Sequence, residues 1–133
     1  MSDRIIKAFK KKEKKLVTFT TGGDPDLDTS LEILNTIISN GIDIIEIGMP
    51  FSDPMADGPT IQESSVRSIA NGTKINDILE IVNKVRKLNN EIPIILMGYY
   101  NSIFNMGIKN FTSKCADVGV DGLIIVDLQP EED

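Results

Sequence analysis

Short apolar runs alternate along this chain with longer stretches whose apolar residues recur at helical spacing. The short runs predict four strands, which span residues 16–21, 42–48, 93–97 and 123–127. The longer stretches predict helices over residues 2–12, 28–40, 60–70, 75–88 and 108–118, and residues 128–133 begin another. In the helix over 60–70 we expect Ile61, Val66 and Ile69 to face inward. Strands that alternate with amphipathic helices form parallel sheets covered by helices, so the fold class is α/β.

Two α/β architectures fit this order: an open doubly wound sheet, or the first four β/α units of a (β/α)8 barrel after an N-terminal helix. The turn Gly22-Gly23-Asp24-Pro25 matches neither the GxGxxG nor the GxxxxGK[ST] phosphate motif. Polar or glycine-rich residues follow all the predicted strands, and a barrel gathers such strand ends on one face. A complete barrel runs about 250 residues. We therefore expect the 133 residues to form a single partial barrel domain over positions 1–133.

The second predicted strand and the loop after it break the regular pattern. Glu46 stands inside an apolar run, where an unpaired charge is costly to bury. The loop that follows carries Asp53 and Asp57 among three prolines. Disagreement between residue type and local pattern is one mark of a functional site. We therefore interpret residues 43–60 as a strand end followed by an active-site loop.

The composition is that of a globular protein, with 41% hydrophobic and 26% charged residues. The net charge of −6 disfavours non-specific nucleic-acid binding, and no apolar run reaches the roughly 20 residues of a membrane helix. Cys115 is the single cysteine and histidine is absent, so zinc sites built on His and Cys clusters are excluded and no metal site is expected. One cysteine suits a reducing compartment, so we expect a cytoplasmic protein. Acid–base chemistry must come from Asp, Glu, Lys, Tyr or this cysteine.

A long stretch of the sequence matches a known family. Residues 46–62, EIGMPFSDPMADGPTIQ, closely resemble the signature of the tryptophan synthase α chain. Residues 19–25, 99–105 and 119–127 also resemble parts of that family. The resemblance runs in register over essentially all 133 residues, but it covers only the N-terminal half of the family's usual length. It implies a (β/α)8 barrel with an added N-terminal helix.

The resemblance also implies a reaction of tryptophan biosynthesis, the retro-aldol cleavage of indole-3-glycerol phosphate to indole and glyceraldehyde 3-phosphate. Glu46 matches the family's catalytic glutamate, which takes a proton from the glycerol hydroxyl and delivers one to C3 of the indole. Asp57 matches the catalytic aspartate, whose carboxylate accepts the N1 hydrogen bond and stabilises the developing charge. Two structural alternatives stay open: Glu46 as an ion-paired carboxylate, and Asp57 as a turn residue before Gly58. Strand alternation places Ile44, Glu46 and Gly48 on one face, the inner face of a barrel.

Other positions match residues that surround the family's site. Phe19 and Tyr99 match positions that line the indole pocket, with core packing as the alternative for each. Asp127 is either a polar residue near the substrate or the cap of a following helix. The expected partner-binding residues are Pro50, Asp53, Asn101, Phe104 and Asn105. A plain role within their loops stays open for Asp53 and for the last three.

The family uses no cofactor in this half-reaction, and its α chain docks on a β chain that carries pyridoxal phosphate. The resemblance therefore implies an α2β2 tetramer in which indole passes between the chains. The 133 residues do not contain the second-half loops that hold the substrate phosphate in the family, so we expect no useful cleavage by this chain alone. The alternative function is a catalytically incompetent half-barrel, or a module that binds the β chain. Open sheet edges predict that such a half-barrel self-associates.

Overall fold

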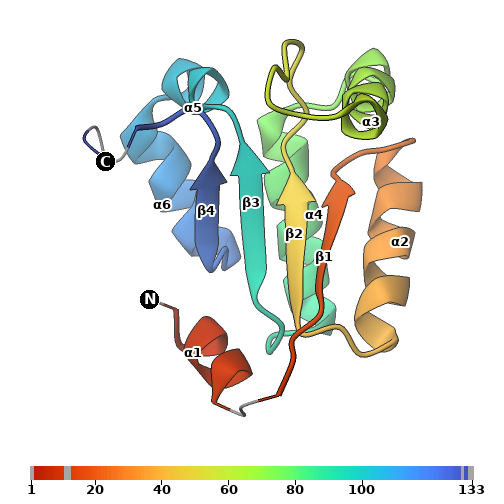
Figure 1. The fold of residues 1–133 in the computed structure, drawn as a ribbon, viewed down its shortest axis with the longest axis vertical. Helices are drawn as coiled ribbons and strands as arrows, with labels where there is room; N and C mark the ends of the chain where they lie inside the picture. Colours follow the sequence, from red (N-terminus) through yellow and green to blue (C-terminus); the bar gives the residue numbers. More distant parts are fainter. Residues whose placement is uncertain (1, 11–12, 130, 132–133) are drawn as a thin grey trace.

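The computed structural model describes residues 2–10, 13–129 and 131 of the chain (Figure 1). Within these residues the strands are β1 (Val17–Thr21), β2 (Ile44–Gly48), β3 (Ile94–Gly98) and β4 (Gly122–Ile125). The helices are α1 (Asp3–Phe9), α2 (Leu27–Ser39), α3 (Pro59–Ala70), α4 (Ile75–Leu88), α5 (Tyr100–Met106) and α6 (Ile108–Val118). Every strand and every helix predicted up to residue 118 is present in the predicted order, and α5 is an addition.

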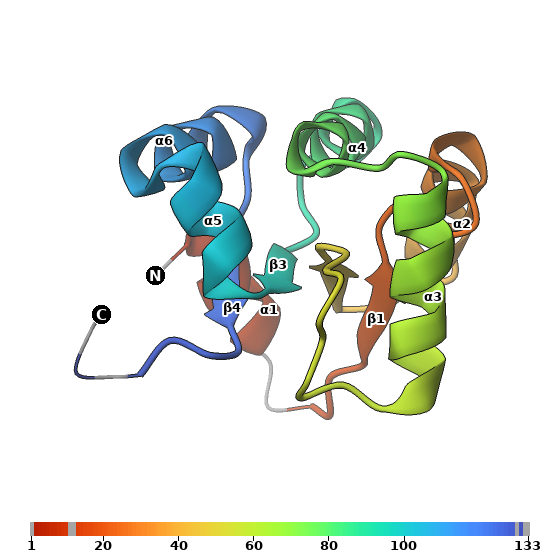
Figure 2. The same cartoon turned by 90° about the horizontal axis from the view of Figure 1, so that it is seen from above.

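The four strands are parallel and pair in the order in which they occur along the chain. One row of paired residues crosses the whole sheet, namely Phe19, Glu46, Ile95 and Gly122. A doubly wound sheet reverses its strand order at the ligand-binding crevice, and this sheet has no such reversal. Seen from above, the sheet is curved, and α2, α4 and α6 lie outside the curve (Figure 2). The chain therefore forms an arc of a (β/α)8 barrel, as the sequence predicts.

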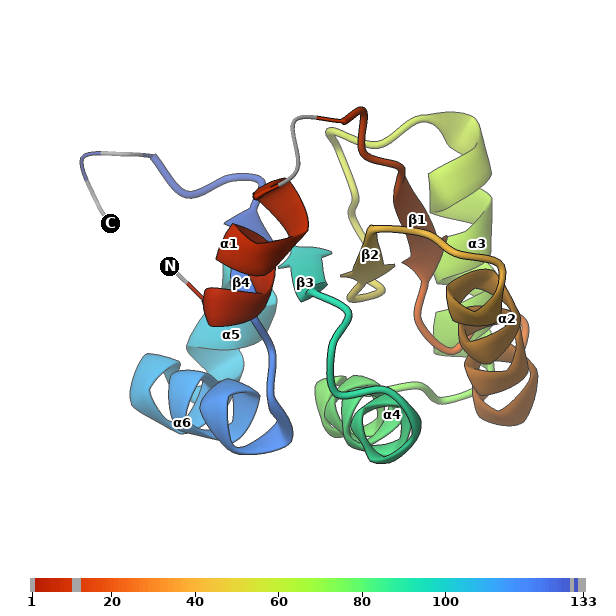
Figure 3. The same cartoon turned by 90° about the horizontal axis from the view of Figure 1, so that it is seen from below.

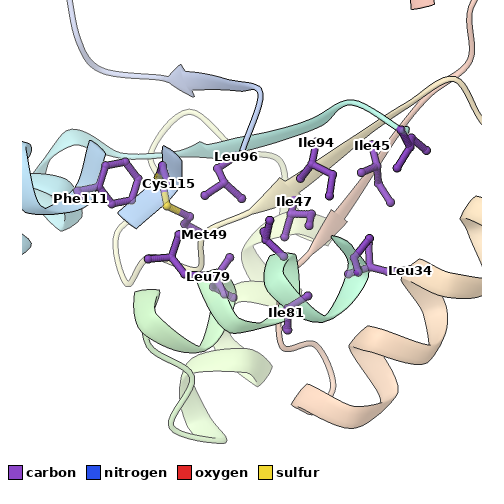
Figure 4. Close-up of a cluster of buried hydrophobic side chains, with 14 of the residues drawn as sticks. Leu34, Ile45, Ile47, Met49, Leu79, Ile81, Ile94, Leu96, Phe111 and Cys115 are labelled. Carbon is purple, nitrogen blue, oxygen red and sulfur yellow. The ribbon is translucent and has the colours of Figure 1, made fainter. Parts of the chain in front are cut away.

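The hydrophobic core fills the space between the convex face of the sheet and these helices (Figure 4). On β3, Ile94 and Leu96 point into this core and are fully buried. The residues between them and after them, Ile95 and Met97, face the concave side and are half-buried. The helices contribute Leu34, Ile78, Val82, Val85, Phe111 and Cys115 to the core. Each such side chain stabilises the fold by about 1.5–3 kcal/mol, so the apolar burial that stabilises the sheet lies mainly on its convex face.

Helix α3 packs through a face that differs from the predicted one. The predicted inward residues Val66 and Ile69 are 64% and 38% exposed. The buried residues of this helix are serines, namely Ser64, Ser65 and Ser68. Small side chains are required because α3 approaches the backbone after β1, where a Cβ on Gly23 would lie 2.9 Å from Oγ of Ser68. The hydrophobic pattern was wrong here because α3 packs against glycines and hydroxyl groups.

The ends of several elements also differ from the prediction. Helix α1 is shorter at both ends, and the Ser2 hydroxyl caps it by accepting a hydrogen bond from the Arg4 amide at 3.2 Å. Residues 11 and 12 of the predicted helix lie outside the described residues. Strand β4 ends at Ile125, two residues earlier than predicted. Of the helix predicted to begin at Leu128, residues 130, 132 and 133 lie outside the described residues, and Leu128 and Gln129 are not helical.

A buried ion-pair network closes the amino-terminal end of the sheet. Asp121 directly precedes β4, and its side chain is 1% exposed. Its carboxylate accepts hydrogen bonds from Arg86 Nη2 at 2.5 Å, Arg4 Nη1 at 3.1 Å, the Ile94 amide at 2.9 Å and the Ser2 hydroxyl. Burial acts to raise the pKa of Asp121, but these hydrogen bonds and the Arg86 charge outweigh it and hold that pKa below its ordinary value. The network ties α1 to the underside of the sheet (Figure 3).

Candidate active site

The loop between β2 and α3, which carries two of the predicted site carboxylates, is fixed where it leaves the sheet. The amide of Met49 donates to the carbonyl of Met97 at 2.7 Å, which extends the β2–β3 pairing by one residue. Two tight turns follow, closed by the amides of Met55 and Asp57. Pro59 then occupies the first position of α3, where its missing amide costs no hydrogen bond. The prolines and tight turns therefore keep the loop compact.

Helix α3 fixes the other end of this loop by its attachment to the segment after β1. Ser68 Oγ donates to the carbonyl of Gly22 at 2.7 Å. Arg67 donates to both carboxylate oxygens of Asp24, at 2.8 and 2.9 Å. Two-pronged pairs of this kind fix orientation as well as distance. The loop therefore runs between two fixed elements, β2 and α3, which determine its course.

Tyr99 comes directly after β3, and the loop wraps around its ring. The residue is 4% exposed, and the ring stacks on Phe51 with the centroids 5.1 Å apart. The hydroxyl accepts a hydrogen bond from the amide of Ala56 at 2.9 Å and donates one to Oδ2 of Asp57 at 3.2 Å. Burial raises the pKa of Tyr99, and the Asp57 charge raises it further, against the opposing effect of the Ala56 amide. The phenol therefore stays protonated at neutral pH and remains a donor to Asp57.

A small hollow with a cavity volume of about 10 Å³ opens at the carboxyl ends of the strands. Three predicted site residues, Phe19, Asp57 and Tyr99, line it together. Gly48 lies at its floor, where a Cβ would be 2.6 Å from Cζ of Phe19, so the phenyl ring occupies the space of a side chain at that position. Phe19 is half-buried. It is not part of the hydrophobic core, which lies on the convex side of the sheet. Complete small-molecule sites measure roughly 300–1,000 Å³, so this hollow is far smaller than a complete site and can supply only part of its lining.

Glu46 lies on the concave face, paired across the sheet with Phe19. It is two residues before Gly48 on the same face, below the hollow and outside its lining. The side chain is half-buried, so the conflict seen in the sequence is milder in the fold. Among the described residues the Glu46 carboxylate forms no ion pair, and its catalytic role stays a prediction.

Asp127 is exposed and follows β4, where its carboxylate accepts the amide of Tyr100 at 2.7 Å. This contact caps the first turn of α5, a role outside both predicted alternatives. Its place near a substrate stays a prediction.

Helix α5 was missed because its seven residues include one buried side chain, Ile103, and so lack an apolar stripe.

The predicted partner-binding residues lie on the loop and on α5, at the same end of the sheet as the hollow. Asn101, Phe104 and Asn105 on α5 are all exposed, and Phe104 is 64% exposed. Asp53 is also exposed, and its carboxylate accepts the Ser52 hydroxyl at 2.7 Å, as a loop brace would. The last of this set, Pro50, is half-buried.

Several residues of the hollow were not predicted: Thr21, Met49, Ile61, Ser65, Met97 and Val126. Two of these have a signal in the sequence, because Thr21 and Met97 follow Phe19 and Ile95 at the two-residue spacing of one strand face. Ser65 has no such signal, since α3 faces the sheet with serines.

No helix in the described ranges is long and apolar enough to span a membrane. Over the same part of the chain, no group of three or more His, Cys, Asp or Glu side chains is placed to hold a metal ion.

A parallel sheet in sequential order, with carboxylates and aromatic residues at the carboxyl ends of its strands, is the arrangement that the family resemblance implies. The family model for the tryptophan synthase alpha chain matches residues 5–133. This chain belongs to the tryptophan synthase α-chain family. It is 55% identical over 132 residues to the tryptophan synthase alpha chain of Geotalea daltonii, covering 99% of this chain and 50% of that protein. It is 51% identical over 134 residues to that of a Thermoanaerobacter species, with 98% and 51% covered.

Solved structures of the tryptophan synthase family share the fold. Tryptophan synthase subunit alpha of Legionella pneumophila superimposes with a TM-score of 0.95 at 39% identity, covering 99% of this chain and 52% of that one. The aminoacrylate-bound tryptophan synthase of M. tuberculosis gives a TM-score of 0.92 at 30% identity, with 98% and 54% covered. The chain therefore spans about half the length of the relatives it matches, and its arc corresponds to part of a tryptophan synthase α-chain barrel.

Proposed function

We propose that this chain supplies the first half of the active site of a tryptophan synthase α chain, which cleaves indole-3-glycerol phosphate to indole and glyceraldehyde 3-phosphate. The observation that carries this proposal is the gathering of Phe19, Asp57 and Tyr99 around one hollow, with Glu46 beside Phe19 on the same concave face. In (β/α)8 barrels the carboxyl ends of the strands hold the active site. Family membership supports the choice of reaction, since tryptophan biosynthesis is the role of the relatives.

Glu46 is the residue that we assign to proton transfer. C3 of the indole ring accepts a proton, which places positive charge on N1. The glycerol hydroxyl next to C3 loses its proton, and its oxygen forms the carbonyl of the aldehyde. The electrons of the broken carbon–carbon bond return to the ring and neutralise N1. Both protons move at neighbouring atoms, so a single half-buried carboxyl group on the concave face can serve both.

Asp57 is the residue that we assign to the indole nitrogen. An ionised carboxylate that accepts the N1 hydrogen bond stabilises the positive charge that develops there. Asp57 lines the hollow together with the ring of Phe19, which offers an apolar contact for the indole. The hollow thus combines an apolar wall and an anionic acceptor, as indole binding requires.

We further propose a β chain that carries pyridoxal phosphate as the partner, in an α2β2 tetramer. This α chain itself takes no cofactor in the proposal, and its location is the cytoplasm. The docking surface includes Pro50 and Asp53 of the loop together with Asn101, Phe104 and Asn105 of α5. Phe104 and Met55, which are 64% and 86% exposed at this end of the molecule, support it, because exposed large apolar side chains often mark docking surfaces.

A second candidate is a partner-binding module without catalysis, and it too predicts exposed loops. For the 133-residue chain by itself we propose self-association through the sheet edges. β1 and β4 each pair on one side only within the described sheet, and Val17, Leu123 and Ile124 are 43%, 39% and 39% exposed. Sedimentation at several concentrations tests this: we expect a dimer or larger species. A clean monomer with a cooperative melt contradicts it.

Catalysis is tested on this chain fused to the second half of the Geotalea daltonii relative, by measuring indole released from indole-3-glycerol phosphate. We expect release by the fusion and none by either half alone. A folded fusion without release contradicts the lyase proposal. Binding of that fusion to an immobilised β chain then decides for the partner-binding module.

A further inference from the structure

We propose that Tyr99 is a positioning residue, whose hydroxyl holds the carboxylate of Asp57 in the orientation that the reaction needs. The inference deepens the proposed function and rests on it, because it concerns the carboxylate assigned to the indole nitrogen. It differs from the sequence prediction, in which the ring of Tyr99 lines the indole pocket. Here the hydroxyl acts on the loop, and the substrate is affected through Asp57.

Three residues of one loop converge on the Tyr99 side chain. Phe51 stacks on its ring, with centroids 5.1 Å apart and planes 22° apart. The amide of Ala56 and the carboxylate of Asp57 both reach its hydroxyl, at 2.9 and 3.2 Å. Because Phe51 is near the start of the loop and the other two residues are near its end, the Tyr99 side chain contacts both ends of the loop.

The chemistry of the hydroxyl fixes the direction of these hydrogen bonds. A phenol has one proton to donate and can also accept. A backbone amide such as that of Ala56 can only donate, so it takes the accepting side of the Tyr99 oxygen. The phenol proton is left for Oδ2 of Asp57. Tyr99 provides the hydrogen bond to this carboxylate within the described residues, which leaves Oδ1 for an N–H donor such as the indole nitrogen.

The support on which this contact rests is rigid. Tyr99 follows Gly98 at the end of β3 and is 4% exposed, so its ring cannot move without opening the packing around it. The next amide, that of Tyr100, is held by Asp127 at 2.7 Å. By contrast, Met55 on the loop is 86% exposed. The Tyr99 hydroxyl thereby attaches the loop to a buried side chain at the end of β3, which is how a carboxylate on a loop acquires a defined orientation.

The chain offers a matched control at the next position. Tyr100 is also a tyrosine, but its ring packs against Phe104 of α5, with centroids 6.1 Å apart. Tyr99→Phe removes two hydrogen bonds and keeps the ring stack on Phe51. Tyr100→Phe makes the same chemical change at a hydroxyl that forms no hydrogen bond with the loop among the described residues.

The first experiment measures amide hydrogen exchange in the 133-residue chain. We expect Tyr99→Phe to speed exchange at Ala56 by about tenfold, the equilibrium factor of one typical hydrogen bond. The amide of Met49, which bonds to Met97, should keep its rate as an internal reference. Tyr100→Phe should leave both amides unchanged. Equal protection of Ala56 in Tyr99→Phe and the parent chain overturns the proposal.

The second experiment follows the phenol by ultraviolet titration in the Tyr100→Phe chain, where Tyr99 is the single tyrosine. The negative charge of Asp57 contributes to the raised pKa of Tyr99, so Asp57→Asn should lower that pKa. An unchanged titration after this substitution contradicts the contact between the two side chains.

The third experiment measures indole release by the fusion with the Geotalea daltonii second half. We expect Tyr99→Phe to lower kcat by about tenfold with little change in KM, and to add nothing once Asp57→Asn is present. If the fusion without substitutions is inactive, the proposed function fails while the exchange and titration results still decide whether Tyr99 positions Asp57. If it is active and Tyr99→Phe matches it, the positioning role is refuted and the proposed function stands.

Discussion

The two ends of the sheet both carry carboxylates, but the burial and the hydrogen-bond partners of these carboxylates differ. At the amino end, Asp121 is 1% exposed and is surrounded by two guanidinium groups, an amide and a hydroxyl. At the carboxyl end, Glu46 and Asp57 are half-buried, and the hydrogen bond to the Asp57 carboxylate is from the neutral phenol of Tyr99. A carboxylate whose partners all belong to the chain stabilises the fold. In the proposed function, a carboxylate that keeps an oxygen without a partner among the described residues is the one that binds a ligand.

The largest effect on stability is expected at the amino end. Asp121→Asn leaves the charge of Arg86 buried without its counter-charge, and breaking a buried pair in this way costs about 3–5 kcal/mol. Urea unfolding at one fixed protein concentration measures the loss. Asp127→Asn is the matched control at the other end of β4, because asparagine also caps helices and the position is exposed. Equal losses in the two variants contradict the distinction between the two ends.

A smaller loss is expected where α3 meets the segment after β1. Ser68→Val removes the hydrogen bond to the Gly22 carbonyl and overfills a contact that has no space for branching, at a cost of about 1–3 kcal/mol. Val66→Ser on the exposed face of the same helix should change stability by less than about 0.5 kcal/mol. The reverse order in urea unfolding would restore the face that the hydrophobic pattern predicts.

Acid should weaken the amino end in particular. The folded-state pKa of Asp121 lies below its ordinary value, so its stabilising contribution is complete above the unfolded pKa of about 3.9 and is lost as pH falls through the folded pKa. Urea midpoints measured from pH 6 down to pH 2 should therefore fall more steeply for the parent chain than for Asp121→Asn. Parallel curves would show that another group carries the acid dependence.

The smallest effect is expected for an ion pair that also involves α1 but lies outside the Asp121 network. Lys7 and Glu91 form a pair in which both side chains are well exposed, at 67% and 72%. Solvent screens such pairs, so Lys7→Ala should leave the urea midpoint unchanged. Arg4→Ala, which removes a partner of Asp121, should lower it. A loss in Lys7→Ala as large as in Arg4→Ala would mean that α1 is held by its surface charges.

Local patterns in the sequence predicted the elements because near-continuous apolar strands and amphipathic helices leave clear periodic signals. The same patterns gave wrong details wherever contacts between distant residues decide. The face of α3 is set by glycines more than 40 positions earlier, as in the contact between Ser68 and Gly22. The cap of α5 comes from Asp127, which is 27 positions after Tyr100.

The candidate site divides in the same way. Glu46 and Asp57 are predicted as site residues from a contiguous signature, and Phe19 and Tyr99 from matching positions. The hydrogen bond from Tyr99 to Asp57 joins residues 42 positions apart, and no local pattern of residue types predicts it. The Asp121 network was missed for the same reason, because Arg86 and Arg4 lie 35 and 117 positions from Asp121.

Indole release by the fusion decides whether the carboxyl end of this sheet performs the proposed chemistry. We predict that Glu46→Gln and Asp57→Asn each lower kcat for cleavage of indole-3-glycerol phosphate by at least about 100-fold, in proteins that keep the parent urea midpoint. If either variant releases indole at the parent rate, the substituted carboxylate does not take part in the cleavage.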